Sequence, residues 1–180
     1  MKTRYLIVML FVLFTNHFVM ASDKIVPCRD SLPAPILQII KTKYKDWHVA
    51  SNMMLNQQDR ERFNSLISNS CYGIIRGKFI SNATSYALYL LKSKGKSYMN
   101  QLIVFQEANG KVNQYVLISS SFAASAMILR KMPSRKLIID ADTGEKFIPS
   151  RDIIDLFDPD KGEIAYFWKG GKFITVTAAE

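Results

Sequence analysis

The sequence predicts an α+β fold, in which a meandering antiparallel sheet carries one or two N-terminal helices on one face. Three observations lead to this expectation. Apolar residues with helical spacing lie before residue 70, and after Cys71 the apolar residues follow the period of a strand. The later apolar runs are separated by short turn segments, not by the long crossovers that parallel strands need.

Two helices are expected near the N-terminus. Pro33 suits the first turn of a helix, and the apolar residues between positions 36 and 40 form one broad face. Lysines in the last turn suit the negative end of the helix, so the first helix should cover residues 33–43. A second, more polar helix begins after Asn56, whose side chain is a good N-cap.

Strands are expected both between the helices and after them. Residues 47–50 form a short apolar run before the second helix. After Cys71, Gly73 and Gly77 indicate a bulge or a close approach within the first of the later strands. Asn109-Gly110 suits a primed hairpin turn. The later strands are expected at residues 72–79, 85–91, 100–106, 111–119, 126–131, 136–141 and 147–149.

The last third of the chain ends in a hairpin. Residues 153–157 fit either one turn of helix or an edge segment. Residues 163–169 and 172–177 are two strands joined by Gly170-Gly171. The aromatic run at positions 166–168 is typical of a strand that faces the core.

The first 21 residues have the features of a secretory signal peptide. Two basic residues precede an apolar run over residues 5–14, which is too short to span a bilayer, and Ala21 fits the position before cleavage. We therefore expect a signal peptide over residues 1–21 and one α+β domain over residues 22–180. No later apolar stretch is long enough for a transmembrane helix, so the mature chain should be periplasmic or secreted.

Positive charge remains in excess after the signal is removed. The signal carries two of the charges that make the formal net charge +9, which leaves +7. The simpler interpretation is that these basic residues lie at solvent-exposed strand ends and turns. The alternative is contact with an acidic protein or an anionic envelope component. Nucleic acid is disfavoured by export and by the absence of aromatic residues among the basic clusters. The residues expected to contact an acidic partner are Lys92, Lys94, Lys96, Arg130, Lys131, Arg135 and Lys136.

The two cysteines, Cys28 and Cys71, are expected to form a disulfide. An exported chain meets an oxidising compartment, and no Cys-x-x-Cys pattern indicates a redox site. Closing a loop of about 44 residues stabilises a fold by roughly 4 kcal/mol in the chain-entropy model.

A repeated acidic segment is the candidate metal site. Asp-x-Asp-x-Gly-Glu occurs at residues 140–145 and again at residues 158–163. Alternate carboxylates can bind calcium, but both segments lack the further ligands of an EF-hand, and Asp and Gly are ordinary turn residues. We expect turns and no cofactor, with weak calcium binding as the alternative. The calcium ligands in that alternative are Asp140, Asp142, Glu145, Asp158, Asp160 and Glu163.

The order of these elements resembles a loose group of small exported bacterial proteins of unassigned function. The resemblance is carried by the helix at 33–43, Trp47, the Cys-Tyr-Gly segment that begins at Cys71, the strand at 86–91 and the aromatic-Trp-Gly-Gly hairpin at 167–173. It implies a fold and no particular reaction.

The sequence favours a partner-binding protein over an enzyme. It contains no Gly-x-Ser-x-Gly elbow or phosphate loop, and His48 is the only histidine after the signal. We expect a periplasmic immunity or inhibitor protein that blocks a surface, because blocking needs shape and charge rather than titratable groups at fixed spacing. The alternatives are an envelope hydrolase with an unrecognised carboxylate site, and a module that binds an anionic lipid or glycan. The last of these predicts an apolar cavity rimmed by lysines.

Overall fold

The computed structural model describes residues 31–51, 55, 57–63, 71–94, 97–123, 127–159 and 161–178. The expected signal peptide, Cys28, Lys96 and Asp160 lie outside these residues, so the statements about them stay predictions. Within the described part of the chain, no helix is both long and apolar enough to cross a bilayer.

Antiparallel strands make up most of the described chain, as the α+β prediction requires, and they form two large sheets. In the first sheet the strands follow the order β1-β3-β4-β5, and β2 pairs with the same side of β3 as β1 does. Their bounds are β1 (His48–Val49), β2 (Ile74–Gly77), β3 (Ser85–Lys94), β4 (Ser97–Ala108) and β5 (Lys111–Ala123). The term first sheet refers to these five strands from here on.

The second sheet follows the order β11-β10-β9-β6, and a small two-stranded sheet joins β7 to β8. Their bounds are β6 (Ile128–Met132), β7 (Ile138–Ile139), β8 (Lys146–Phe147), β9 (Ile153–Asp158), β10 (Gly162–Lys169) and β11 (Lys172–Ala178). All pairs in these sheets are antiparallel.

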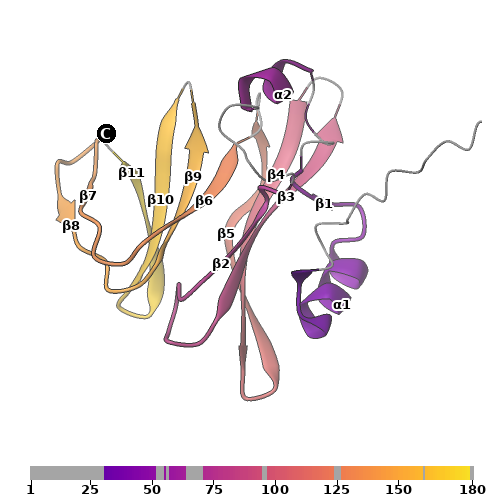
Figure 1. The fold of residues 1–180 in the computed structure, drawn as a ribbon, viewed down its shortest axis with the longest axis horizontal. Helices are drawn as coiled ribbons and strands as arrows, with labels where there is room; N and C mark the ends of the chain where they lie inside the picture. The colour runs from indigo at the N-terminus through magenta and orange to yellow at the C-terminus, as the bar shows by residue number, and fades with distance from the viewer. Residues whose placement is uncertain are drawn as a thin grey trace, which may run out of the picture.

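The elements are stacked in layers (Figure 1). Helix α1 (Ala34–Lys43) covers one face of the first sheet, and the second sheet lies against the opposite face. The segment that contains β7 and β8 covers the outer face of the second sheet. Each boundary between layers holds a hydrophobic cluster, and the one between the two sheets is the largest. Burying apolar surface on both faces of each sheet is the main source of stability in such a stack.

Helix α1 confirms the predicted packing on one face of a sheet. Pro33 stands at its N-cap, and its last turn contains the two expected lysines. Ile36 and Ile40 are buried against the first sheet because they lie one turn apart on the same side of the helix. The second expected helix is α2 (Gln57–Phe63), whose Phe63 joins the cluster between the two sheets.

Residues 153–157 form a central strand, so the expectation of a helix turn or an edge segment was wrong. Strand β9 pairs with β10 on one side and with β6 on the other. Ile153 faces the outer cluster and Ile154 the inner one, so both faces of the strand are buried. A strand buried on both faces lacks the alternation of apolar and polar residues that identifies a half-buried strand.

The predicted hairpins at both Gly-containing turns are confirmed. Asn109 and Gly110 join β4 to β5, and both have positive φ, at 54° and 72°. Gly170 and Gly171 join β10 to β11 with φ of 59° and 81°. Two consecutive positive φ values are the signature of the primed turn that matches strand twist.

Candidate functional site

An open pocket of about 470 Å³ lies where the β10–β11 turn meets the segment after β8 and the loop after β2. This volume falls in the range of small-ligand pockets, roughly 300–1,000 Å³. Its lining residues are Ile80, Lys146, Phe147, Ile148, Pro149, Ser150, Arg151, Phe167, Trp168, Lys169 and Gly170. We call it the basic pocket.

Two aromatic side chains are buried beneath the basic pocket. Phe147 and Phe167 are buried, and their ring centroids lie 5.1 Å apart at an interplanar angle of 47°. Both belong to the outer hydrophobic cluster, which holds them in place. Trp168 also lines the pocket, but its half-buried ring packs in the cluster between the two sheets, where it meets the ring of Phe173 edge-on at 5.1 Å. Ile148 is 70% exposed and offers apolar surface to a ligand.

Three cations line the pocket: Lys146, Arg151 and Lys169. Lys169 Nζ lies 5.1 Å from the centroid of the Phe147 ring, so the ammonium stands over this ring. The Arg151 guanidinium donates a hydrogen bond to Asn82 Oδ1 in the loop after β2. No carboxylate of the described residues forms an ion pair with any of the three. The pocket therefore presents uncompensated positive charge beside apolar surface.

Backbone and side-chain hydrogen bonds hold the walls of the pocket. The backbone N–H of Arg135 donates to the carbonyl of Pro149 at 2.7 Å. Asp152 Oδ2 accepts a hydrogen bond from the backbone N–H of Lys78 at 2.8 Å, which ties the segment after β8 to the loop after β2. Fixed walls reduce the conformational entropy that a ligand must remove on binding.

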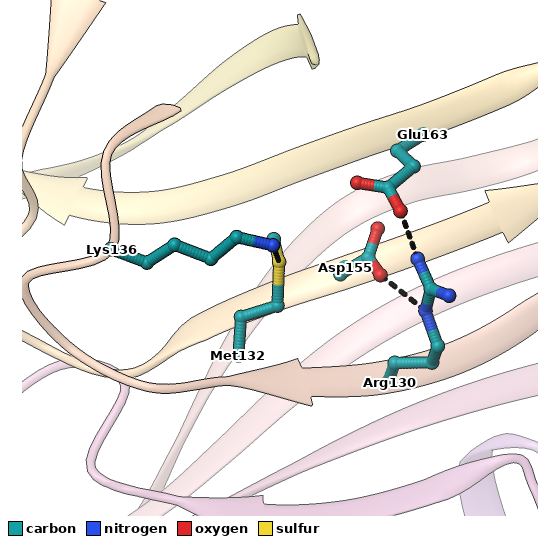
Figure 2. A network of polar contacts seen from close by, with 5 residues as sticks. All are labelled: Arg130, Met132, Lys136, Asp155 and Glu163. Atoms are coloured by element: carbon teal, nitrogen blue, oxygen red, sulfur yellow. Dashed lines mark hydrogen bonds and ion pairs between the residues drawn. The ribbon is translucent and has the colours of Figure 1, made fainter. Parts of the chain in front are cut away.

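A second polar cluster lies on the outer face of the second sheet, and Figure 2 shows it. Arg130 on β6 reaches between two carboxylates, Asp155 on β9 and Glu163 on β10. Its Nε donates to Asp155 Oδ2 at 2.5 Å, and Arg130 Nη2 donates to Glu163 Oε1. Lys136 Nζ lies 3.0 Å from the sulfur of Met132 in the same cluster.

Asp155 is an unusual carboxylate because its side chain is 0% exposed. Its Oδ1 has no hydrogen-bond partner, while Oδ2 is bound by Arg130. Burial raises the pKa of Asp155 to about 6, against the opposing effect of Arg130. Glu163 also raises this pKa, and Lys136 lowers it. Asp155 does not line the basic pocket, so its altered pKa gives no direct support to an enzyme.

We expect the stability of the protein to fall as the pH rises from about 4 to above 6. The pKa of Asp155 is about 6 in the folded chain, above its ordinary value of 3.8, so the folded state holds this proton more tightly than the unfolded state does. Ionising Asp155 in the folded state then costs up to about 3 kcal/mol. Urea unfolding of the native protein and of Asp155→Asn between pH 4 and pH 8 measures this effect. The difference in unfolding free energy between the native protein and Asp155→Asn should change by about 3 kcal/mol over this pH range. If the two proteins show the same dependence of stability on pH, the burial of an ionisable carboxylate at position 155 is contradicted.

The candidate calcium ligands lie in turns and in the Arg130 cluster. Asp140 Oδ1 accepts the backbone N–H of Asp142 at 2.9 Å, and Gly144 has φ of 72°, as in an ordinary turn between β7 and β8. Glu145 donates its backbone N–H to Thr143. Asp158 is buried at the end of β9, and Lys161 Nζ lies 4.0 Å from it. In the part of the chain that the structure describes, no group of three or more potential ligands gathers. Calcium binding stays a prediction.

The predicted contacts to an acidic partner are spread over the molecule. Arg130 is occupied by two carboxylates, whereas Lys131, Arg135 and Lys136 are exposed. Lys92 is exposed near the β3–β4 end of the first sheet, far along β3 from the loop that contains Ile80. Lys94 is the last residue of β3.

Sequence reasoning missed the three cations of the basic pocket. Lys146, Arg151 and Lys169 do not form a cluster in the sequence, and only the fold brings them together. Cys71 lies just before β2, is half-buried and is not a free thiol. Its pairing with Cys28 stays a prediction.

No family model, no curated protein and no solved structure matches this chain.

Proposed function

We propose that this chain is an exported binding protein that receives an anionic envelope component in the basic pocket. The observation that carries the proposal is the set of cations Lys146, Arg151 and Lys169 that line this pocket, with no described carboxylate paired to them. Cations that line one open pocket and have no paired carboxylate favour an anionic ligand, such as a lipid headgroup or an acidic glycan.

A second candidate is an immunity or inhibitor protein that covers an acidic protein. The observation in its favour is the exposed turn after β6, which contains Arg135, Lys136 and Leu137, the last of them 48% exposed, and follows the exposed Lys131 of β6. The bond between Arg135 and Pro149 places this turn beside the pocket. Protein partners cover about 800 Å² on each side, so such a partner would need this turn as well as the pocket.

Charge reversal tests the proposal. We expect Lys146→Glu combined with Lys169→Glu to weaken binding of an anionic probe about tenfold or more, because both lysines line the same pocket. The matched control is Lys92→Glu with Lys111→Glu, which makes the same change of net charge on the first sheet. The probes are phosphatidylglycerol vesicles, polygalacturonate and polyglutamate, titrated calorimetrically at low and moderate salt.

The three probes separate the candidates. Tight binding of lipid or glycan that only the pocket variant weakens supports the main proposal. If polyglutamate binds, and if Lys131→Glu with Arg135→Glu weakens that binding more than the pocket variant does, the result favours the inhibitor. If none of the probes binds at low salt, or if the pocket and control variants behave alike, the basic pocket is not a binding site for anions.

A further inference from the structure

Strand β5 forms one edge of the first sheet, and its outer side has no partner strand among the described residues. It pairs with β4 on its inner side. Within the described part of the chain, no backbone hydrogen bond outside the strand ladders involves a residue of β5. An edge strand presents a row of unpaired N–H and C=O groups, which can pair with a further extended strand. The outer side of β5 is therefore open to strand addition.

The other long edges of the described sheets are less open. Strand β11 forms one edge of the second sheet, but the Thr177 carbonyl accepts the backbone N–H of Ala141, so the segment after β7 covers part of it. Strand β6, at the opposite edge, carries two adjacent cations, Arg130 and Lys131. Charged side chains and covering segments are the usual protection of a sheet edge. Strand β5 contains a single charged residue, Lys111, and no proline.

The side chains of β5 are largely apolar but poorly covered. None of its described residues is buried, although the strand contains Val112, Tyr115 and Val116. Val116 is 50% exposed. In the neighbouring β4, by contrast, residues 102–105 are all 0% exposed. Apolar side chains at a sheet edge bury more surface when another strand is added beside them, which favours such an addition.

The part of β5 that suits regular pairing is short. Over residues 111–116 the register with β4 is unbroken, up to the pair of Val116 with Ile103. Beyond this part the register shifts on both sides of Leu102. Such shifts bend and twist a strand away from a regular ladder. A partner strand therefore pairs over a few residues, and the association is expected to be weak.

Charge favours a second copy of this chain as the partner. The whole chain has a formal net charge of +9, so two copies repel each other wherever their basic surfaces meet. The edge of β5 is nearly neutral, and two copies can meet there at the least electrostatic cost. An acidic strand would find only one cation in β5, whereas a second β5 is a neutral, apolar strand of the same length.

We infer that two copies of this chain form a symmetric dimer, in which their β5 strands pair antiparallel and join the two first sheets. A two-fold axis perpendicular to the sheet keeps equivalent faces together, so the register is centred on one residue. Centring on Gln114 uses the whole regular segment and places Val112 of one copy opposite Val116 of the second copy. These side chains share the face that carries α1, because Gln114 accepts hydrogen bonds from Lys43 and Tyr44 at the end of that helix.

Analytical ultracentrifugation of the purified protein over a range of concentrations tests the inference. We expect a monomer–dimer equilibrium with a dissociation constant in the micromolar range and no larger species, because a two-fold contact closes on itself. Higher ionic strength should strengthen the dimer, because salt screens the repulsion between two basic copies. A monomer at every concentration, association beyond the dimer, or a dimer that salt weakens would each overturn the inference.

Val116→Lys separates edge pairing from other contacts. It places a charge on the pairing edge and should weaken the dimer at least about tenfold. Val116 is 50% exposed, so the thermal midpoint of the monomer should change little. Leu137→Lys is the matched control, because it makes the same change of charge at an apolar side chain that is 48% exposed. If the two variants weaken the dimer equally, general charge repulsion is responsible and β5 does not form the contact.

Cysteine cross-linking tests the register. In the proposed pairing, the two side chains of Gln114→Cys lie directly opposite each other, with Cβ atoms about 5 Å apart. The equivalent side chains of Asn113→Cys lie diagonally, about 7–8 Å apart, which is too far for a disulfide. Mild oxidation should link the first variant into a dimer and leave the second unlinked, with the native protein as the blank for its own cysteines. Equal linkage of both variants, or of neither, contradicts the proposed pairing.

Hydrogen exchange distinguishes a second copy from another partner. In the dimer, backbone amides of residues 112–116 should exchange more slowly as the protein concentration rises. If the protein stays monomeric, and if a neutral strand-forming peptide of unrelated sequence slows exchange at these amides, the edge of β5 receives a strand of another protein. The inference of a dimer is then wrong.

Discussion

Replacing Arg130 by alanine should destabilise the protein by about 3–4 kcal/mol at pH 8. Arg130 is the group that binds Asp155, whose side chain is 0% exposed and whose other oxygen has no partner. Removing one member of a buried ion pair leaves an uncompensated charge, which typically costs about 3–5 kcal/mol. The side chain of Arg130 is itself 39% exposed, so the expected destabilisation lies near the lower end of the range for broken buried ion pairs. Its guanidinium also lies 3.9 Å from the centroid of the Phe157 ring, and that contact is lost too.

Urea unfolding at pH 5 and at pH 8 tests whether the unpaired charge of Asp155 causes this destabilisation. At pH 5 Asp155 is largely protonated in the native protein, because its pKa is about 6, so the cost of losing Arg130 should shrink. Lys131→Ala, an exposed neighbour on the same strand, is the control and should change stability by no more than about 0.5 kcal/mol. Arg130→Met combined with Asp155→Leu should recover most of the stability, because an apolar pair removes the buried charge. A cost that is equal at pH 5 and pH 8 would show that lost packing is responsible.

Replacing Gly73 by alanine should destabilise the protein by about 3 kcal/mol. A Cβ at position 73 would lie 2.6 Å from the backbone nitrogen of Ala50 and 2.7 Å from its carbonyl oxygen. These atoms belong to the ladder at the junction of β1 and β2, where Gly73 donates to Ala50 and Ala50 donates to Tyr89. The strands must separate to admit a methyl group, which combines overpacking with the loss of backbone hydrogen bonds.

Gly110→Ala is the matched control. Nothing lies within 4 Å of a Cβ there, but φ is 72°, so the cost should be about 1 kcal/mol of backbone strain. Adding Ala50→Gly to Gly73→Ala should restore little of the lost stability, because two of the three atoms closest to the new Cβ belong to the backbone of Ala50. If thermal unfolding shows that Gly73→Ala is at least as stable as Gly110→Ala, the close approach of Gly73 to the backbone of Ala50 is contradicted.

Local patterns in the sequence were sufficient for much of the fold. Helix α1 was predicted over 33–43 and observed over 34–43, because its apolar face, Pro33 and terminal lysines act within a few residues of one another. The hairpins at Asn109 and at Gly170 were predicted for the same reason, since positive φ is a property of the turn residues themselves. Gly73 was expected to mark a bulge or a close approach, and the close approach was found.

Other features needed information about partners distant in the sequence. Residues 153–157 were assigned incorrectly because a strand buried on both faces has no local period. Arg130 was predicted to contact an acidic partner, but its charge is taken up by Asp155 and Glu163, which lie 25 and 33 residues away along the chain. The acidic partners of a cation cannot be recognised until strand pairing is known.

By itself, the sequence determined the α+β class, the N-terminal helix and the positions of the main hairpins, because each depends on residues within one turn or one strand pair. The tertiary structure alone decided how the strands divide into two sheets and which of them lie at the centre. It also decided that Lys146, Arg151 and Lys169 line one pocket. The physical reason is that burial and charge compensation depend on contacts between residues far apart in the chain, and these exist only when the layers are stacked.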